Sequence, residues 1–139
     1  MSGVAIILAK LKAHAPLAAV VPTARMEAGD LPLKTILPAI SVVQVSSTER
    51  WTVDMAASPV LTQDRVQVTV LAKTYPQLRQ ALRLVRQACP QTRGVLQVSD
   101  TVSFTVDSIL PDVEGPDFFD ADVAFAGGTR DFLVTWAAS

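Results

Sequence analysis

The sequence predicts an α+β fold, in which a mainly antiparallel or mixed β-sheet carries two α-helices packed on one face. Two segments repeat apolar residues at helical spacing, and three others have the apolar and β-branched patterns of strands. Direct strand-to-strand links outnumber strand–helix–strand alternation, which favours antiparallel pairing. No linker-like stretch divides the 139 residues, half of which are hydrophobic. We therefore expect one domain over residues 1–139.

The chain is expected to begin with a helix over residues 3–13. Its apolar residues recur at helical spacing and are Val4, Ile7, Leu8 and Leu11. Pro16 either ends this helix or begins a short second turn, because proline is tolerated in the first turn but not in a helix interior. The following segment 29–38 contains two prolines and is expected to be a loop.

A strand and a long polar segment should come next. Residues 39–46 have β-branched side chains pointing both ways, as in a strand covered on both faces. Residues 49–64 are polar, contain Pro59 and have no sustained period, which predicts an excursion of the chain or a long hairpin loop. Long loops in compact domains are often functional.

The middle of the chain has the clearest periodic patterns. Apolar and polar residues alternate over 66–72 and again over 102–110, and each pattern predicts a half-buried strand. Between them, one helical stripe holds Tyr75, Leu78, Leu82, Val85 and Cys89. Pro90 should stop this helix.

The last expected element is a hairpin. Strand-like runs at 123–125 and 132–136 flank Gly127 and Gly128, a pair suited to a turn that needs positive φ. No helix follows these glycines, so they do not form a phosphate-binding loop.

Composition restricts the class of protein. The net charge of −1 argues against a dedicated nucleic-acid or anionic-membrane binder with a basic surface. The single cysteine cannot form an internal disulfide and suits a reducing compartment. The apolar run near the N-terminus has no preceding basic residue and is interrupted by Lys10 and Lys12, unlike a signal peptide. We therefore expect a protein made in the cytoplasm.

A search for catalytic and metal-binding residues predicts no active site and no cofactor. His14, the only histidine, reads as a solvated residue at a helix end, and Cys89 as a buried small hydrophobe. The acidic run is Asp112, Glu114, Asp117, Asp120 and Asp122. Its spacing does not match an EF-hand, and we interpret it as a solvated acidic loop that could dock on a basic neighbour.

Three groups of residues are candidate interface contacts. Arg79, Arg83 and Arg86 share one face of the predicted helix, where they could contact phosphates or an acidic partner or could form its solvated side. Trp51 is a large aromatic in a polar loop, and aromatics are favoured as interface anchors. The acidic candidates are Asp112, Glu114, Asp117 and Asp120.

The order of these motifs resembles a known family. The strand start Pro38-Ala39-Ile40 and Gln44-Val45-Ser46 are followed by Arg65–Ala72, which runs into Thr74-Tyr75-Pro76 and the helix 77–88. This order resembles the tail-completion, or tail-terminator, proteins of long-tailed bacteriophages and prophages. Its most specific part is 65–89, whereas 117–128 is less like the family.

The resemblance implies a structural virion protein without catalytic activity. Such a subunit forms a ring, typically a hexamer, that caps the finished tail tube and presents the surface for head attachment. The implied partners are copies of the chain, the tail tube protein and a head-tail connector, with genome DNA passing through the channel without specific binding. The implied location is the tail or neck of the virion.

Two alternatives remain open at this stage. A head-tail joining or other neck protein has similar size and no active site, and a small ligand- or peptide-binding module would use the sheet face. An apolar pocket in place of a filled core would favour the binding module. Under the ring interpretation, Trp51→Ala should weaken ring formation or tail docking and leave the fold intact.

Overall fold

The computed structural model describes residues 2–29, 36–50, 61–99, 101–120 and 125–138. Over these residues it contains three α-helices and one 3₁₀ turn: α1 (Ser2–Ala13), α2 (Ala15–Val20), the turn Thr23–Arg25 and α3 (Tyr75–Ala88). Its strands are β1 (Met26–Ala28), β2 (Ala39–Arg50), β3 (Leu61–Ala72), β4 (Gly94–Gln97), β5 (Ser103–Glu114), β6 (Phe118–Asp120) and β7 (Phe125–Ala138). No helix within the described part of the chain is long and apolar enough to cross a membrane.

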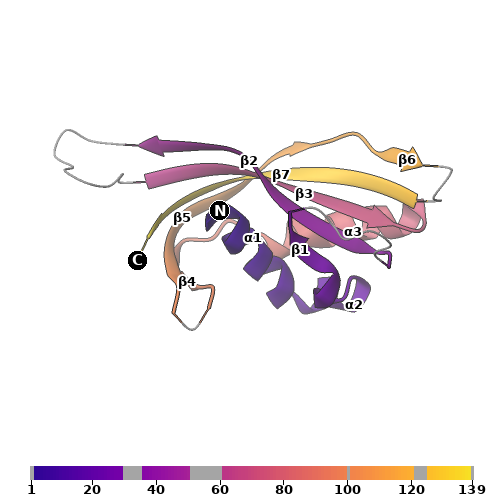
Figure 1. Cartoon of the computed structure of the whole chain (residues 1–139), viewed down its shortest axis with the longest axis horizontal. Helices are drawn as coiled ribbons and strands as arrows, with labels where there is room; N and C mark the ends of the chain where they lie inside the picture. The colour runs from indigo at the N-terminus through magenta and orange to yellow at the C-terminus, as the bar shows by residue number, and fades with distance from the viewer. Residues whose placement is uncertain (1, 30–35, 51–60, 100, 121–124, 139) are drawn as a thin grey trace.

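The strands form one sheet in the order β1-β2-β3-β7-β5-β4, with β6 paired to β7. All pairs are antiparallel except β1 with β2, which is parallel. The helices lie on one side of the curled sheet (Figure 1). The predicted α+β class, with a mainly antiparallel sheet and two main helices, is therefore confirmed.

The core lies between this sheet face and helices α1 and α3. Helix α1 packs against β1, β2 and β3, while α3 packs against β3 and β7. Every second side chain of β3 is buried, as the alternation over 66–72 predicted. Fully burying a large aliphatic side chain stabilises a fold by about 1.5–3 kcal/mol. The fully buried Ile6, Ile7 and Leu11 of α1 therefore fix that helix on the sheet.

The prediction of a long loop over 49–64 is wrong at both of its ends. Strand β2 continues to Arg50 and β3 begins at Leu61, with these two residues paired across an antiparallel hairpin. The polar composition misled the prediction, because this part of β2 is exposed and needs no apolar residues. For the same reason β2 is not covered on both faces throughout, and Val45 is 52% exposed.

The predicted turn at Gly127 and Gly128 is also wrong. Both glycines lie inside β7, which pairs with β3 on one side and with β5 and β6 on the other. Close packing explains them better than turn geometry does. A Cβ atom on Gly128 would lie 2.9 Å from Leu82 Cδ1, and one on Gly127 would overlap the Phe118 ring.

A buried carboxylate joins the N-terminus of α1 to the hairpin and to β7. Asp64 Oδ2 accepts hydrogen bonds from the Gly3 backbone N–H and from Trp136 Nε1, each 2.9 Å long. Its Oδ1 accepts one from Ser47 Oγ at 2.6 Å. Both carboxylate oxygens of Asp64 therefore have hydrogen-bond donors, which come from three separate segments of the chain. We call these four residues the Asp64 junction.

Candidate interaction site

The candidate site is built on helix α3, whose ends and faces are set by local sequence. Thr74 caps the helix by accepting a hydrogen bond from the Gln77 backbone N–H at 3.3 Å, and Pro76 stands in the first turn. The apolar stripe is buried from Leu78 to Cys89, whereas Tyr75 is 45% exposed. The opposite face carries the three arginines that the sequence pattern placed together.

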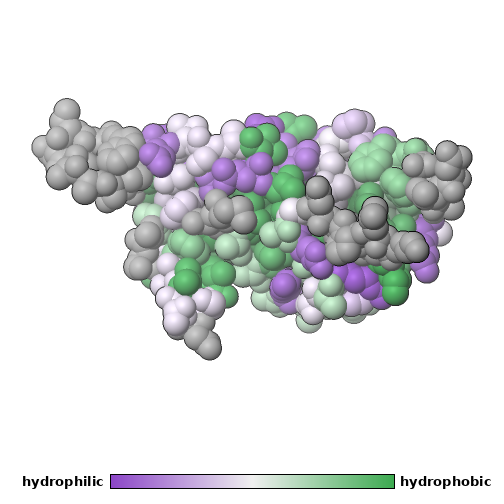
Figure 2. Space-filling model, viewed as in Figure 1, coloured by the Kyte–Doolittle hydropathy of each residue, from purple (hydrophilic) through white to green (hydrophobic). Residues whose placement is uncertain are grey.

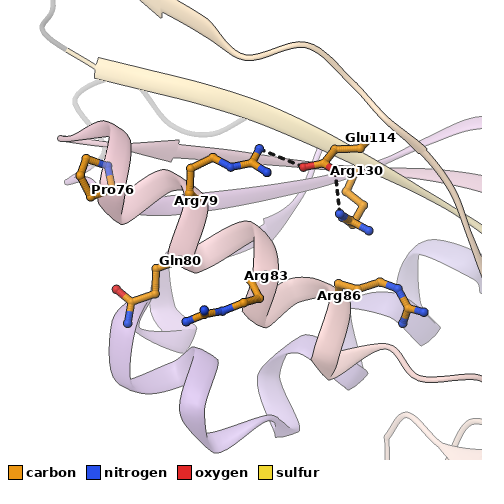
Figure 3. A pocket seen from close by; sticks show the side chains of 7 residues that line it. All are labelled: Pro76, Arg79, Gln80, Arg83, Arg86, Glu114 and Arg130. Atoms are coloured by element: carbon orange, nitrogen blue, oxygen red, sulfur yellow. Dashed lines mark hydrogen bonds and ion pairs between the residues drawn. The ribbon is translucent and has the colours of Figure 1, made fainter.

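These arginines line a groove of about 550 Å³ between α3 and the neighbouring parts of β5 and β7 (Figure 3). We call it the arginine groove, and its lining residues are Pro76, Arg79, Gln80, Arg83, Arg86, Glu114 and Arg130. The structure thus brings together four of the predicted interface residues, Arg79, Arg83, Arg86 and Glu114. The arginine face therefore forms one wall of a concave surface.

Glu114 is the central ion-pair partner in the arginine groove. Its Oε1 lies 2.9 Å from Arg79 Nη1, and its Oε2 lies 2.9 Å from Arg130 Nη2. Both oxygens of the carboxylate are therefore engaged by guanidinium groups. The hydrogen bond to Glu114 raises the pKa of Arg79 further above its ordinary value.

Asp117 connects the groove to an exposed aromatic side chain. The Tyr75 hydroxyl donates a hydrogen bond of 2.8 Å to Asp117 Oδ2, and Asp117 Oδ1 lies 3.5 Å from Arg79 Nη1. This hydrogen bond to a carboxylate raises the pKa of Tyr75, because ionising the hydroxyl would place two negative charges together.

Other donors in the groove have no partner within the described part of the chain. No hydrogen bond or ion pair joins Arg83 or Arg86 to another of the described residues, and Figure 3 shows both side chains away from Glu114. Arg130 Nε is buried and likewise without a hydrogen-bond partner in the described structure. The arginine groove can therefore accept further anionic groups.

The remaining predicted interface residues lie elsewhere. Asp112 pairs with Arg65, with Oδ2 and Nη2 2.6 Å apart, and Arg65 also reaches Asp131 at 3.2 Å. Asp120 ends β6, and its side chain is outside the description. Trp51 and Asp122 lie outside the described residues.

The first part of the acidic run is not a loop, although Asp112 and Glu114 are exposed as expected. Asp112 and Glu114 belong to strand β5, and with Asp117 they form ion pairs to arginines of the same chain. The basic partners of these three acidic residues are therefore arginines of the same chain, Arg65 and Arg79 among them, and not a neighbouring protein. Their pairing depends on contacts between distant segments, which spacing along the chain does not reveal.

Two residues that matter here were not predicted from the sequence. Asp64 lies on the same face of β3 as the buried Val66, Val68 and Val70, because side chains two residues apart in a strand point to the same side. Extending the alternation toward the N-terminus would therefore have predicted that Asp64 is buried. Arg130 offered no such local signal, because its partner Glu114 comes from another strand.

The residues considered for catalysis take separate positions. Cys89 is buried, and burial raises the pKa of its thiol to about 12, so the thiolate nucleophile is disfavoured. His14 is half-buried, and its Nε2 is buried without a hydrogen-bond partner among the described atoms, so the prediction of a solvated helix-end residue is only partly correct. The described residues contain no cluster of three or more His, Cys, Asp or Glu side chains that could hold a metal ion.

Comparison with known proteins gives a match among solved structures. No protein-family model matches the sequence, and no curated protein matches it. Among solved structures, the chain is similar to a protein chain from the virion of a native gene transfer agent (GTA) particle. The match has a TM-score of 0.65 and 13% sequence identity, and it covers 95% of this chain and 92% of the other. The two chains therefore share a fold over nearly their whole lengths.

Proposed function

We propose that this chain is a structural protein of a phage-like particle, and that it acts by assembly and not by catalysis. The observation that carries this proposal is the shared fold with a chain of the GTA virion, which extends over almost all of both chains. More narrowly, we propose a tail terminator that closes into a hexameric ring, caps the tail tube and presents the surface for head attachment. This narrower role is supported by the sequence resemblance described above.

Ring formation requires two different surfaces on each subunit, because a closed ring uses head-to-tail contacts. The β2–β3 hairpin extends beyond the helices at one end of the long axis, and β6 lies at the other end (Figure 1). We propose that these two ends meet between neighbouring subunits. The exposed residues 44–50 of β2 would contribute the hairpin side of this contact.

The second end carries an exposed aromatic patch, which consists of Tyr75, Phe118 and Phe119. Phe119 is 66% exposed, and its ring centroid lies 5.8 Å from that of Tyr75. Figure 2 shows hydrophobic residues gathered over β6 at this end of the molecule. Exposed aromatic side chains are typical anchors of protein interfaces, which suits a contact between subunits.

The purified chain should therefore be tested for assembly by light scattering, negative-stain imaging and binding to tail tubes. We expect closed rings, either free or on tube ends, and tails of uniform length. Phe119→Ser should abolish the rings, while the matched control Val95→Ser, at a 70% exposed residue of β4, should retain them. A chain that forms no rings and binds no tubes would contradict the tail-terminator role.

A further inference from the structure

The arginine groove has an excess of positive charge that the described part of the chain does not neutralise. Its lining holds four arginines and one glutamate. We propose that the groove binds phosphate groups of a DNA backbone, independently of base sequence. The choice of DNA as the source of the phosphates rests on the proposed function, in which the subunit belongs to a particle that transfers DNA.

Unused donors are the first support for this site. Arg79 and Arg130 use part of their donor set on Glu114, whereas Arg83 and Arg86 make no ion pair within the described chain. Guanidinium groups bind phosphate oxygens through paired N–H donors, so both arginines present the geometry that phosphates require.

The spacing of the arginines favours an extended anion. Along α3, Arg83 lies about 6 Å from Arg79 in the axial direction, and Arg86 lies about 4.5 Å further, at about 1.5 Å per residue. A row of donors with this length matches successive charges along a polymer better than one small anion. The groove is also open at the surface, so a polymer can reach it (Figure 3).

A second copy of the chain is a poorer occupant of the groove. Most acidic side chains placed by the structure are already paired with arginines, as Asp112, Glu114 and Asp117 are. The described surface therefore offers no cluster of unpaired carboxylates that would complement the arginine row. DNA supplies such a row of charges, and counterion release makes its binding dependent on salt.

The test measures binding of the full-length chain to a labelled DNA duplex of mixed sequence by fluorescence polarisation, over a range of salt concentrations starting at about 50 mM. The variant Arg83→Gln/Arg86→Gln removes two unpaired groove arginines. Its matched control, Lys12→Gln/Arg93→Gln, removes the same charge at exposed positions outside the groove.

We expect the groove variant to bind DNA at least about tenfold more weakly and to lower the salt slope by about two, roughly one for each phosphate that is no longer bound. The control should stay within about threefold of the parent chain. Equal reductions in the two variants would overturn the proposal, as would failure of the parent chain to bind DNA at low salt. Tighter binding of labelled polyglutamate than of DNA would also overturn it, because the groove would then be a docking site for an acidic protein segment.

Two further measurements separate this inference from the proposed function. Thermal unfolding should be unchanged in the groove variant, since neither arginine makes an ion pair to another described residue, so weaker binding would not reflect misfolding. Rings that cap tail tubes but bind no DNA would overturn the groove proposal alone. DNA binding that depends on the groove, in a chain that neither forms rings nor binds tubes, would leave the phosphate site standing and contradict the tail-terminator role.

Discussion

The Asp64 junction and the arginine groove both contain charged side chains and join distant parts of the chain. They differ in that the charged group of the junction has hydrogen-bond partners within the described part of the chain, whereas several charged groups of the groove do not. At the junction, one carboxylate accepts three hydrogen bonds and is 1% exposed. In the groove, the guanidinium donors outnumber the acceptors of Glu114, and Arg83 and Arg86 have no ion-pair partner among described residues.

The difference separates a structural role from an interaction role. A buried charge costs several kcal/mol unless its hydrogen bonds are satisfied, so the junction must be complete within the folded chain. The solvent-accessible guanidinium groups of Arg83 and Arg86 can remain unpaired, because water solvates them in the absence of an anion. Breaking the junction should therefore reduce stability, whereas changing the groove should alter binding.

The largest expected effect comes from Asp64→Ala. This change leaves the Gly3 N–H and the Trp136 Nε1–H without their acceptor and removes the partner of Ser47. We expect the free energy of unfolding to fall by about 3 kcal/mol, measured by urea denaturation. Asp107→Ala removes an exposed carboxylate and should change it by less than about 0.5 kcal/mol. Equal effects of the two changes would show that burial does not set Asp64 apart from a surface carboxylate.

A smaller reduction is expected from Trp136→Phe. The phenyl ring retains most of the edge contact with Phe104, whose ring centroid is 5.3 Å from that of Trp136, but it cannot donate to Asp64. One donor is removed while two remain, so the free energy of unfolding should fall by about 1 kcal/mol. A reduction as large as that of Asp64→Ala would show that packing of the indole, and not its hydrogen bond, dominates.

Glu114→Gln should have little effect on stability and should strengthen binding. Its ion pairs are partly exposed, and such pairs contribute about 0–1 kcal/mol. Removing the negative charge frees Arg79 and Arg130, so the affinity for DNA should rise by a few-fold at low salt. Fluorescence polarisation with the labelled duplex measures this change, and a fall in affinity would contradict the role of the groove.

The smallest expected effect is that of Arg86→Gln on the reactivity of Cys89, which tests whether the charge of the arginine groove influences the core. Burial raises its pKa to about 12 from an ordinary value of 9.0, although the positive charges of Lys10 and Arg86 lower it slightly. At pH 8 the thiolate should be roughly 1000-fold rarer in the folded chain than in the unfolded one. Labelling by a thiol reagent should be slower by about that factor, and Arg86→Gln should slow it slightly further, because a positive charge that lowers the pKa of Cys89 is removed. Rapid labelling of the folded chain would place Cys89 nearer the surface.

Much of the fold could be predicted because its signals are local. Helix α3 and strand β3 both have an apolar stripe with the period of their own secondary structure. The helix was located correctly, and the strand was located correctly over 66–72 but not over its first residues. The polar ends of the β2–β3 hairpin were missed, because an exposed strand has no apolar residues to mark it. Gly127 and Gly128 were misplaced because the close approach of Leu82 and Phe118 comes from elements far away in the sequence.

The sequence by itself therefore determined the fold class, the apolar faces of the helices and the row Arg79, Arg83 and Arg86, since these depend on periods of two or 3.6 residues. Only the tertiary structure decided which donors bind the Asp64 carboxylate, and that Glu114 and Arg130 meet the arginine row to form a groove. Contacts between strands that are distant in the chain produce both arrangements. No periodic pattern encodes which charged residue will face which, because that depends on strand order and register.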